Sequence, residues 1–176
     1  MIGVILYGPP ASGKDTITDA LCALDARYRP FQRLKVGVGK TAGYRMGTAS
    51  DIDTLRRNGD VIWENRRYGS TYVVDRPHLA CEISTHTPVL HLGQVDAVPA
   101  VLAAIPDANF LTVQLWCPRD VAADRMKLRG DDLAARLAAW DETEPLPHAD
   151  LVIDTAEASA DEAARQIDSC LNSRGK

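Results

Sequence analysis

Short apolar runs along the chain predict the strands of a buried sheet. The first run, Ile2–Tyr7, is continuous and contains β-branched residues, which is typical of a strand covered on both faces. Three further runs, PVLHL, FLTVQLW and DLVIDT, have the same character and lie at 88–92, 110–116 and 150–155. We therefore expect a sheet whose strands are spread over the whole chain.

Apolar residues at helical spacing separate these runs. In KDTITDALCAL, Ile17, Leu21 and Leu24 lie three or four positions apart, as on one face of a helix. Similar patterns predict helices at roughly 94–105, 118–128, 131–141 and 158–171. Strands that alternate with helices favour a parallel sheet with helices on both faces. The pattern predicts an α/β fold class with a sheet of about five strands.

One long segment breaks the alternation. Residues 31–75 are rich in Gly, Arg, Lys and Tyr, and contain one polar helical pattern near 50–57. We interpret this segment as an acceptor-binding insert, and call it the insert. A second special segment, about 128–136, contains Gly130 between two helical patterns and is expected to act as a short mobile lid.

The sequence GPPASGKDT, at 8–16, directly follows the first predicted strand and precedes a predicted helix. Gly8 and Gly13 allow a backbone path that a Cβ atom would block, so that amide hydrogens can surround phosphate oxygens. The positive end of the following helix supports anion binding, and Lys14 can reach the outer phosphates. The loop therefore predicts a nucleotide triphosphate site formed by Gly8, Pro9, Pro10, Ala11, Ser12, Gly13, Lys14, Asp15 and Thr16.

Asp15 stands where such loops usually carry Ser or Thr. A carboxylate beside phosphates is tolerable if Mg²⁺ lies between them, since Mg²⁺ prefers oxygen ligands and keeps several waters. Thr16 is the other candidate ligand of the metal. Alternatively, Asp15 caps the helix or pairs with a nearby arginine. Metal and structural roles both remain open for Asp15 at this point.

Basic residues gather in two parts of the chain. In the insert they are Arg33, Lys35, Lys40, Arg45, Arg66 and Arg67. In the later part they are Arg125, Arg129 and Arg136, and the first two lie at i and i+4 on one helix face. Beside a phosphate loop, such cations suit phosphoryl transfer, in which charge around the moving group must be neutralised.

Side chains for acid–base chemistry are not grouped in the sequence. His78, His86, His91 and His148 are scattered without a ligand spacing, and we interpret each as structural or superficial. This pattern fits an acceptor that is itself a phosphate, because its oxygen is already anionic near neutral pH and needs no general base.

Length, charge and cysteine content exclude several classes. The 176 residues, 45% of them hydrophobic, fit one domain spanning 1–176. A formal charge of −4 argues against binding of a nucleic-acid polymer. Four widely spaced cysteines argue against a disulfide framework, and no apolar run resembles a signal peptide or a membrane span. We expect a cytoplasmic protein with a small phosphorylated substrate and no membrane partner, and the oligomeric state stays open.

Several motifs, in order, resemble the guanylate kinase family of nucleoside monophosphate kinases. They are the loop GPPASGKDT, the stretch YRMGTASDIDTLRRNGDVIWENRRYGSTY, the arginines of RMKLRG…ARL, and the late strand HADLVIDT. The resemblance implies a P-loop NTPase fold and an ATP- and Mg²⁺-dependent kinase. It places Lys14, Arg125, Arg129 and Arg136 at the transferring phosphates, and Gly8, Gly13 and Thr16 at ATP and Mg²⁺. It also implies Tyr44 and Tyr68 near the acceptor phosphate, with Ser70 and Glu64 at the acceptor base.

The acceptor side departs from that family. The usual Thr-Thr-Arg-x-x-Arg stretch is replaced by RLKVGVGKTAGY, where Lys35 or Lys40 would take its place. His91 and Gly93 stand where an acidic residue is usual. Asp after the loop lysine also resembles ribose 1,5-bisphosphate phosphokinase, a related enzyme. The leading hypothesis is phosphorylation of a nucleoside monophosphate. The alternatives are a ribose bisphosphate phosphokinase-like enzyme and a non-catalytic guanylate-kinase-like binding module, with a nucleotide-hydrolysing switch ranked last.

Overall fold

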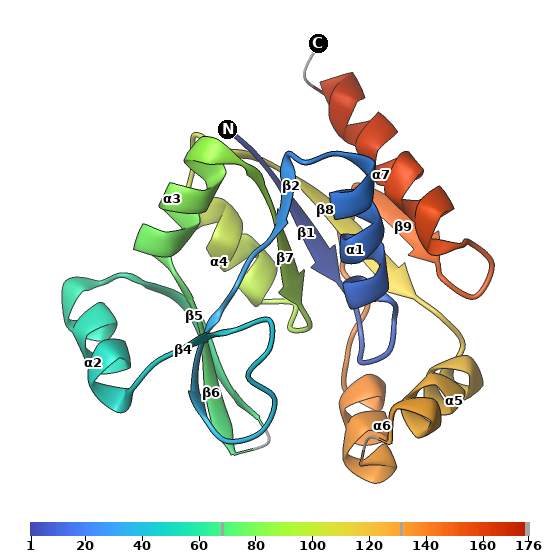
Figure 1. Ribbon diagram of the computed structural model, residues 1–176, viewed down its shortest axis with the longest axis horizontal. Coiled ribbons are helices and arrows are strands. Elements are labelled where there is room, and N and C mark those ends of the chain that lie inside the picture. The colour runs from blue at the N-terminus through green and yellow to red at the C-terminus, as the bar shows by residue number, and fades with distance from the viewer. Residues whose placement is uncertain (68, 131, 175–176) are drawn as a thin grey trace.

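The structure, a computed structural model, describes residues 1–67, 69–130 and 132–174 and has a five-stranded parallel sheet at its centre (Figure 1). In spatial order the strands are β2 (Tyr28–Pro30), β7 (Thr87–Leu92), β1 (Ile2–Tyr7), β8 (Asn109–Trp116) and β9 (Leu151–Asp154). The predicted α/β class is confirmed, and the four apolar runs are β1, β7, β8 and β9. The pattern missed β2, because three residues ending in a proline give too short a signal.

Helices cover both faces of this sheet. On one face lie α1 (Lys14–Leu24) and α7 (Ala160–Arg174), and on the other lie α3 (Arg76–Thr85) and α4 (Ala97–Ala104) (Figure 1). Alternate residues of β1 separate the two cores: Val4 and Leu6 pack toward α1 and α7, whereas Ile5 and Tyr7 pack toward α3 and α4. The period-two alternation of a strand therefore gives each helical layer its own apolar surface.

The sequence pattern did not predict α3. The sequence of α3 is RPHLACEIST, and of these residues Leu79 and Ile83 are buried. Two apolar positions are too few to give a clear helical pattern. The helix instead begins with a local signal, since the Asp75 carboxylate accepts a hydrogen bond from the His78 amide at 3.1 Å and Pro77 lies in the first turn.

The insert forms a second, smaller sheet. Its strand order is β4–β3–β6–β5, with β3 (Leu34–Gly37), β4 (Arg45–Met46), β5 (Val61–Arg67) and β6 (Ser70–Asp75). Helix α2 (Ala49–Asn58) covers it, and packs Ile52 against Leu34 and Val73. Arg45 forms an ion pair with the buried Asp75, which joins β4 to the end of β6.

Helices α5 (Arg119–Arg129) and α6 (Leu133–Asp141) lie beyond the carboxyl end of β8, across from the insert (Figure 1). Gly130 ends α5 in the left-handed conformation with φ 69°, and Asp132 caps α6 by accepting a hydrogen bond from the Ala135 amide. The predicted lid at 128–136 thus falls on the turn between two helices, which we call the lid helices.

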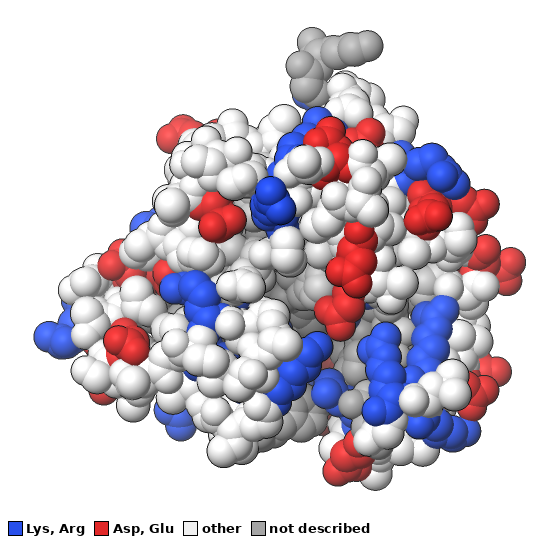
Figure 2. Space-filling model, viewed as in Figure 1, with Lys and Arg blue, Asp and Glu red and all other residues white. Residues whose placement is uncertain are grey.

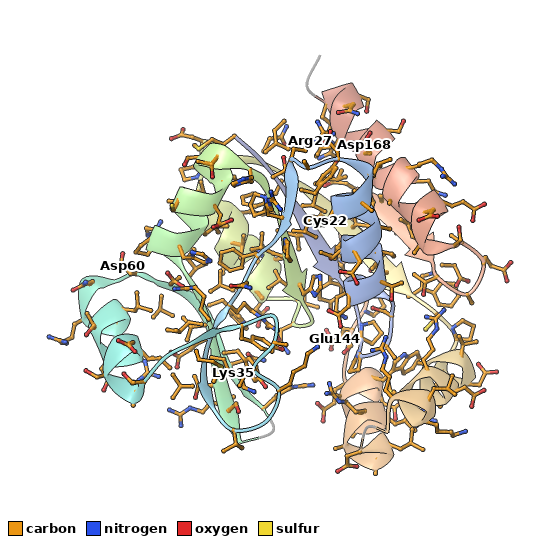
Figure 3. The ribbon with its side chains drawn as sticks, in the orientation of Figure 1. Cys22, Arg27, Lys35, Asp60, Glu144 and Asp168 are labelled. Atoms are coloured by element: carbon orange, nitrogen blue, oxygen red, sulfur yellow. The ribbon has the colours of Figure 1, made fainter. Side chains whose placement is uncertain are left out.

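The carboxyl ends of β1 and β7 point toward the space between the insert and the lid helices (Figure 1). Both chain termini lie at the opposite end, where Arg27 and Asp168 meet (Figure 3). There the Tyr28 hydroxyl donates to Asp168 at 2.7 Å and ties β2 to α7. In the described parts of the chain, no helix combines the length and apolar character that crossing a membrane requires.

Candidate functional site

A cleft of about 560 Å³ opens where the phosphate loop, the insert and the lid helices meet. Figure 2 shows Lys and Arg side chains on both sides of the hollow between the insert and the lid. Its cationic lining residues are Lys14 from the loop, Arg33, Lys35, Lys40 and Arg67 from the insert, and Arg129 and Arg136 from the lid. Asp15 and Asp132 are its acidic lining residues in the described chain. The cleft therefore offers a strongly cationic surface within an acidic protein.

The phosphate loop lies between β1 and α1, at the carboxyl end of the central strand. The Gly8 amide donates to the Leu92 carbonyl at 3.2 Å, and the Ser12 amide closes a turn on the Pro9 carbonyl at 3.3 Å. Gly13, with φ 92°, is the N-cap residue of α1, and its left-handed backbone conformation directs the chain into the helix. The strand–glycine loop–helix order required for phosphate binding is therefore present.

Lys14 lies folded over this loop. Its Nζ donates to the carbonyl oxygens of Gly8 and Pro9 at 2.6 and 2.7 Å and to Ser12 Oγ at 3.2 Å. Burial lowers the pKa of Lys14 to about 7, although the neighbouring Asp15 opposes that shift. A bound phosphate would place a negative charge beside this ammonium group and stabilise its charged form.

Asp15 and His91 form a pair at the bottom of the cleft. His91 Nδ1 lies 3.3 Å from Asp15 Oδ1, and its Nε2 lies 2.7 Å from Thr18 Oγ1. The hydrogen bond from His91 holds the pKa of Asp15 well below its usual range, and Lys40 and Lys14 add to this effect. Burial lowers the pKa of His91, against the influence of Asp15. His91, interpreted from sequence as structural or superficial, thus lies in the cleft.

The lid arginines divide into two groups. Arg129 and Arg136 line the cleft, with Asp132 between them. Arg125 instead donates to the carbonyls of Ala11 and Thr155 at 3.1 and 2.6 Å and to Thr155 Oγ1 at 2.9 Å. It lines a second cavity of about 410 Å³ behind the loop, together with Thr16 and with Arg129, which borders both cavities. Arg125 therefore braces the phosphate loop against the end of β9.

Lys35, expected to bind the acceptor, is 2% exposed. Its Nζ donates to the carbonyls of Val38 and Lys40, both at 2.7 Å, and lies 5.3 and 5.5 Å from the ring centres of Tyr44 and Tyr72. The lysine fixes the glycine-rich turn that carries Lys40 over the cleft (Figure 3 labels Lys35). Its charge still contributes to the potential of the cleft, and Lys40 and Tyr44 line the cleft as well.

Two described residues expected at the acceptor, Glu64 and Ser70, do not line the cleft. Glu64 binds Arg56 through two hydrogen bonds of 3.0 and 2.8 Å on the α2 side of the insert. Ser70 is buried and donates to the Val38 carbonyl at 3.0 Å, beneath the same glycine-rich turn. Tyr68 lies outside the described residues. The base-reading positions implied by the resemblance therefore do not meet here as a group.

Sequence reasoning missed several residues that line the cleft. Asn65 and Tyr72 are register partners on β5 and β6, and both line it, as does Gln94 after β7. Asn65 Oδ1 is buried, and no described residue donates a hydrogen bond to it. The signal for this pair is the alternation of the β5–β6 hairpin, which becomes readable only once the register is known.

The fold of the chain is similar to that of solved structures of other proteins. A guanylate kinase from Anaplasma phagocytophilum superposes with a TM-score of 0.68 at 16% identity, over 98% of this chain and 85% of that one. The protein APE1195 gives a TM-score of 0.56 at 19% identity, over 98% of this chain and 95% of its own. The chain has a guanylate kinase-like fold. At the level of sequence, neither a family model nor a curated protein matches it.

Within this P-loop kinase fold, the donor set for a metal is small. In the described parts of the chain, no three His, Cys, Asp or Glu side chains gather as a metal cage. That is compatible with Mg²⁺, which keeps waters and binds through one or two carboxylates and the substrate phosphates. Asp15 lies in the cleft with 64% of its side chain exposed, whereas Thr16 lines the second cavity. The residues present fit Mg²⁺ bound near Asp15.

Proposed function

We propose that the protein is a phosphotransferase that moves the terminal phosphoryl group of ATP to the phosphate group of a small metabolite. The observation that carries this proposal is the shared cleft: Lys14 of the glycine loop, Arg129 and Arg136 of the lid, and the cationic insert all face one cavity. A nucleoside monophosphate is the leading acceptor, because guanylate kinase shares the fold.

The chemistry balances without a protein base. The bond from the terminal phosphorus to the bridging oxygen of ATP breaks, and its electron pair stays on ADP. A new bond forms between that phosphorus and an anionic oxygen of the acceptor phosphate, so no proton has to be removed. The protein's task is to hold two anions together and neutralise the charge that the transfer redistributes.

The chain divides this task among its parts. The Ala11 and Gly13 amides of the loop and the Lys14 ammonium would hold the donor phosphates, and Asp15 would hold Mg²⁺. When bound, Mg²⁺ neutralises phosphate charge and orients the phosphoryl group. Arg129 and Arg136 approach from the lid side. Closure of the lid onto the insert would exclude water, which otherwise competes as acceptor.

A second candidate acceptor, a sugar bisphosphate, is favoured by the charges of the insert. The described lining residues of the insert include Arg33, Lys35, Lys40 and Arg67 but no carboxylate, and Glu64 is turned toward Arg56. The guanine edge presents hydrogen-bond donors, for which a carboxylate is the natural acceptor. A second phosphate, with a charge of about −1.5 to −2 at pH 7, would instead match the cations.

An acceptor panel tests the proposed reaction and separates these candidates. The purified protein is mixed with ATP, Mg²⁺ and each ribo- and deoxynucleoside monophosphate or ribose 1,5-bisphosphate, and acceptor-dependent ADP release is followed. We expect one class to raise ADP release well above the ATP-only rate. Response to one nucleotide identifies a monophosphate kinase, and response to the sugar bisphosphate identifies the second candidate. ATP binding with silence across the panel would contradict both, and a protein that binds phosphorylated partners without turnover would then fit better.

Replacing Arg129 by alanine tests the lid. Arg129 lies in the last turn of α5 and lines the cleft, so its loss should lower kcat about 10²-fold or more while the fold persists. Lys127→Ala, two residues earlier, is the control, because Lys127 pairs with Asp124 on the exposed side of α5. Steady-state kinetics with the best acceptor measure both variants. Equal rates for the two variants would show that Arg129 has no part in the transfer.

A further inference from the structure

A chain of polar contacts joins the phosphate loop to the end of β7. Thr18 Oγ1 lies 2.9 Å from the Lys14 carbonyl oxygen and 2.7 Å from His91 Nε2, and its hydroxyl hydrogen can be donated to either one. On the other side of the ring, His91 Nδ1 lies 3.3 Å from Asp15 Oδ1. The contacts link the first turn of α1 to the neighbouring strand of the central sheet, in the floor of the cleft.

The two ends of this chain differ in exposure. Thr18 is 3% exposed and the His91 side chain 22%, whereas the Asp15 side chain is 64% exposed. The imidazole is thus held by the packed interior, and the carboxylate extends from it toward the open cleft. One carboxylate oxygen is engaged by His91, and among the described residues no hydrogen bond engages Asp15 Oδ2.

The two contacts of the His91 ring decide which hydrogen-bonding roles its nitrogens can take. A carboxylate can only accept, so Nδ1 carries the hydrogen that faces Asp15. The Thr18 hydroxyl has a single hydrogen and lies within reach of both the Lys14 carbonyl and Nε2. When it donates to Nε2, the neutral ring carries its one hydrogen on Nδ1, facing Asp15. Neither ring nitrogen keeps a lone pair directed at the cleft, so His91 cannot take a proton from a substrate without breaking this chain.

We propose that His91 is a positioning residue that aims the free oxygen of Asp15 at the metal ion accompanying the donor nucleotide. This inference rests on the proposed phosphotransferase function. It assigns the metal contact to Asp15 rather than to Thr16, which lines the cavity behind the loop beside Arg125.

Physical chemistry supports a histidine in this place. Carboxylates that bind metals are themselves hydrogen-bonded, and loss of such an outer partner typically costs about 10–100-fold in metal affinity. An unheld Asp15 could turn toward Lys14 or Lys40, both of which attract it. Binding His91 through one oxygen leaves the other available to a hard cation, which prefers oxygen ligands.

The test measures metal affinity rather than turnover. Mn²⁺ binding to the protein saturated with a non-hydrolysable ATP analogue is followed by electron paramagnetic resonance, and analogue binding is measured separately in EDTA. For His91→Leu we expect about 10–100-fold weaker Mn²⁺ binding with nearly unchanged metal-free analogue binding. His91→Asn, whose amide can still donate to Asp15, should recover part of the affinity. His86→Leu, at an exposed histidine after α3, is the matched control.

The outcomes separate this inference from the proposed function. Unchanged Mn²⁺ affinity in His91→Leu would overturn the positioning role. The same holds if His91→Leu weakens analogue binding in EDTA as much as it weakens Mn²⁺ binding. Thr18→Val, which removes the hydroxyl but keeps the shape, provides the same comparison if His91→Leu does not fold, and should weaken Mn²⁺ binding in the same direction. A wild-type protein that does not bind the analogue at all would overturn the phosphotransferase proposal itself.

Discussion

Replacing Lys14 by methionine is expected to abolish phosphoryl transfer, with a fall in kcat of at least about 10³-fold. The Lys14 ammonium is the charge that lies inside the glycine loop, bonded to the carbonyls of Gly8 and Pro9. Methionine keeps the length and flexibility of the side chain but removes its charge and its three hydrogens. Acceptor-dependent ADP release and ATP binding are the two measurements.

The same variant should not be less stable near neutral pH. Burial lowers the pKa of Lys14 to about 7, so holding its charge in the folded ligand-free protein costs free energy. In the unfolded chain the lysine keeps its ordinary pKa of about 10.4 and binds the proton more tightly. This destabilising contribution is therefore complete below about pH 7 and fades as the pH rises from 7 toward 10. Methionine removes it at every pH.

Denaturant unfolding at a series of pH values between 6 and 9.5 detects this difference. The free energy of unfolding of the wild type should rise relative to Lys14→Met across that range, because the folded lysine loses its proton first. Lys127→Met is the control, since Lys127 is exposed and pairs with Asp124. Full turnover in Lys14→Met would refute the assignment of the loop, and a pH profile parallel to the wild type would show that Lys14 stays charged.

How far the sequence predicts this molecule depends on the range of the interactions. The phosphate loop is local: strand, glycines, lysine and helix follow one another, and the structure has them in that order. The lid arginines are not local. Arg125 and Arg129 are expected on one helix face. In the structure, however, the Arg125 guanidinium donates to Thr155, which lies thirty residues further along the chain. The periodicity of a helix cannot predict a contact with a residue so far away in the sequence.

The insert shows the same limit at the scale of one residue. Glu64 and Asn65 are neighbours on β5, so their side chains lie on opposite faces of the small sheet. The register of β5 with β6 shifts between Val61 and Trp63, and this irregularity lies ahead of the two residues. With the observed register, Asn65 faces the cleft and Glu64 faces Arg56 of α2. A resemblance read from sequence cannot decide between two adjacent positions.

The partners of His91 could not be predicted from the sequence for a related reason. On β7 it follows buried apolar residues, and a single histidine in such a run is typical of a structural position. Its partners come from α1, where Asp15 and Thr18 are one helical turn apart. The pairing depends on β7 lying beside β1 in the sheet, which strand order alone decides.

Replacing Gly8 by alanine should produce the largest loss of stability in the loop. A Cβ at position 8 would stand 2.2 Å from the Leu115 carbonyl oxygen and 2.8 Å from Ser12 Oγ. The carbonyl belongs to the backbone of β8, so relief requires the sheet or the loop to move. We expect a loss of about 3 kcal/mol or more in the free energy of unfolding, together with loss of ATP binding.

Gly59→Ala separates this clash from the general strain of a glycine position. Gly59 also has a positive φ, 71°, but a Cβ there meets no atom within 4 Å. It should cost only about 1–2 kcal/mol and leave ATP binding intact. Chemical unfolding and calorimetric ATP binding measure both variants. Equal losses at the two positions would show that backbone angle alone makes Gly8 necessary. A much larger loss at Gly8 would mean that the packing of β1 against β8 demands the first glycine of the loop before any phosphate is bound.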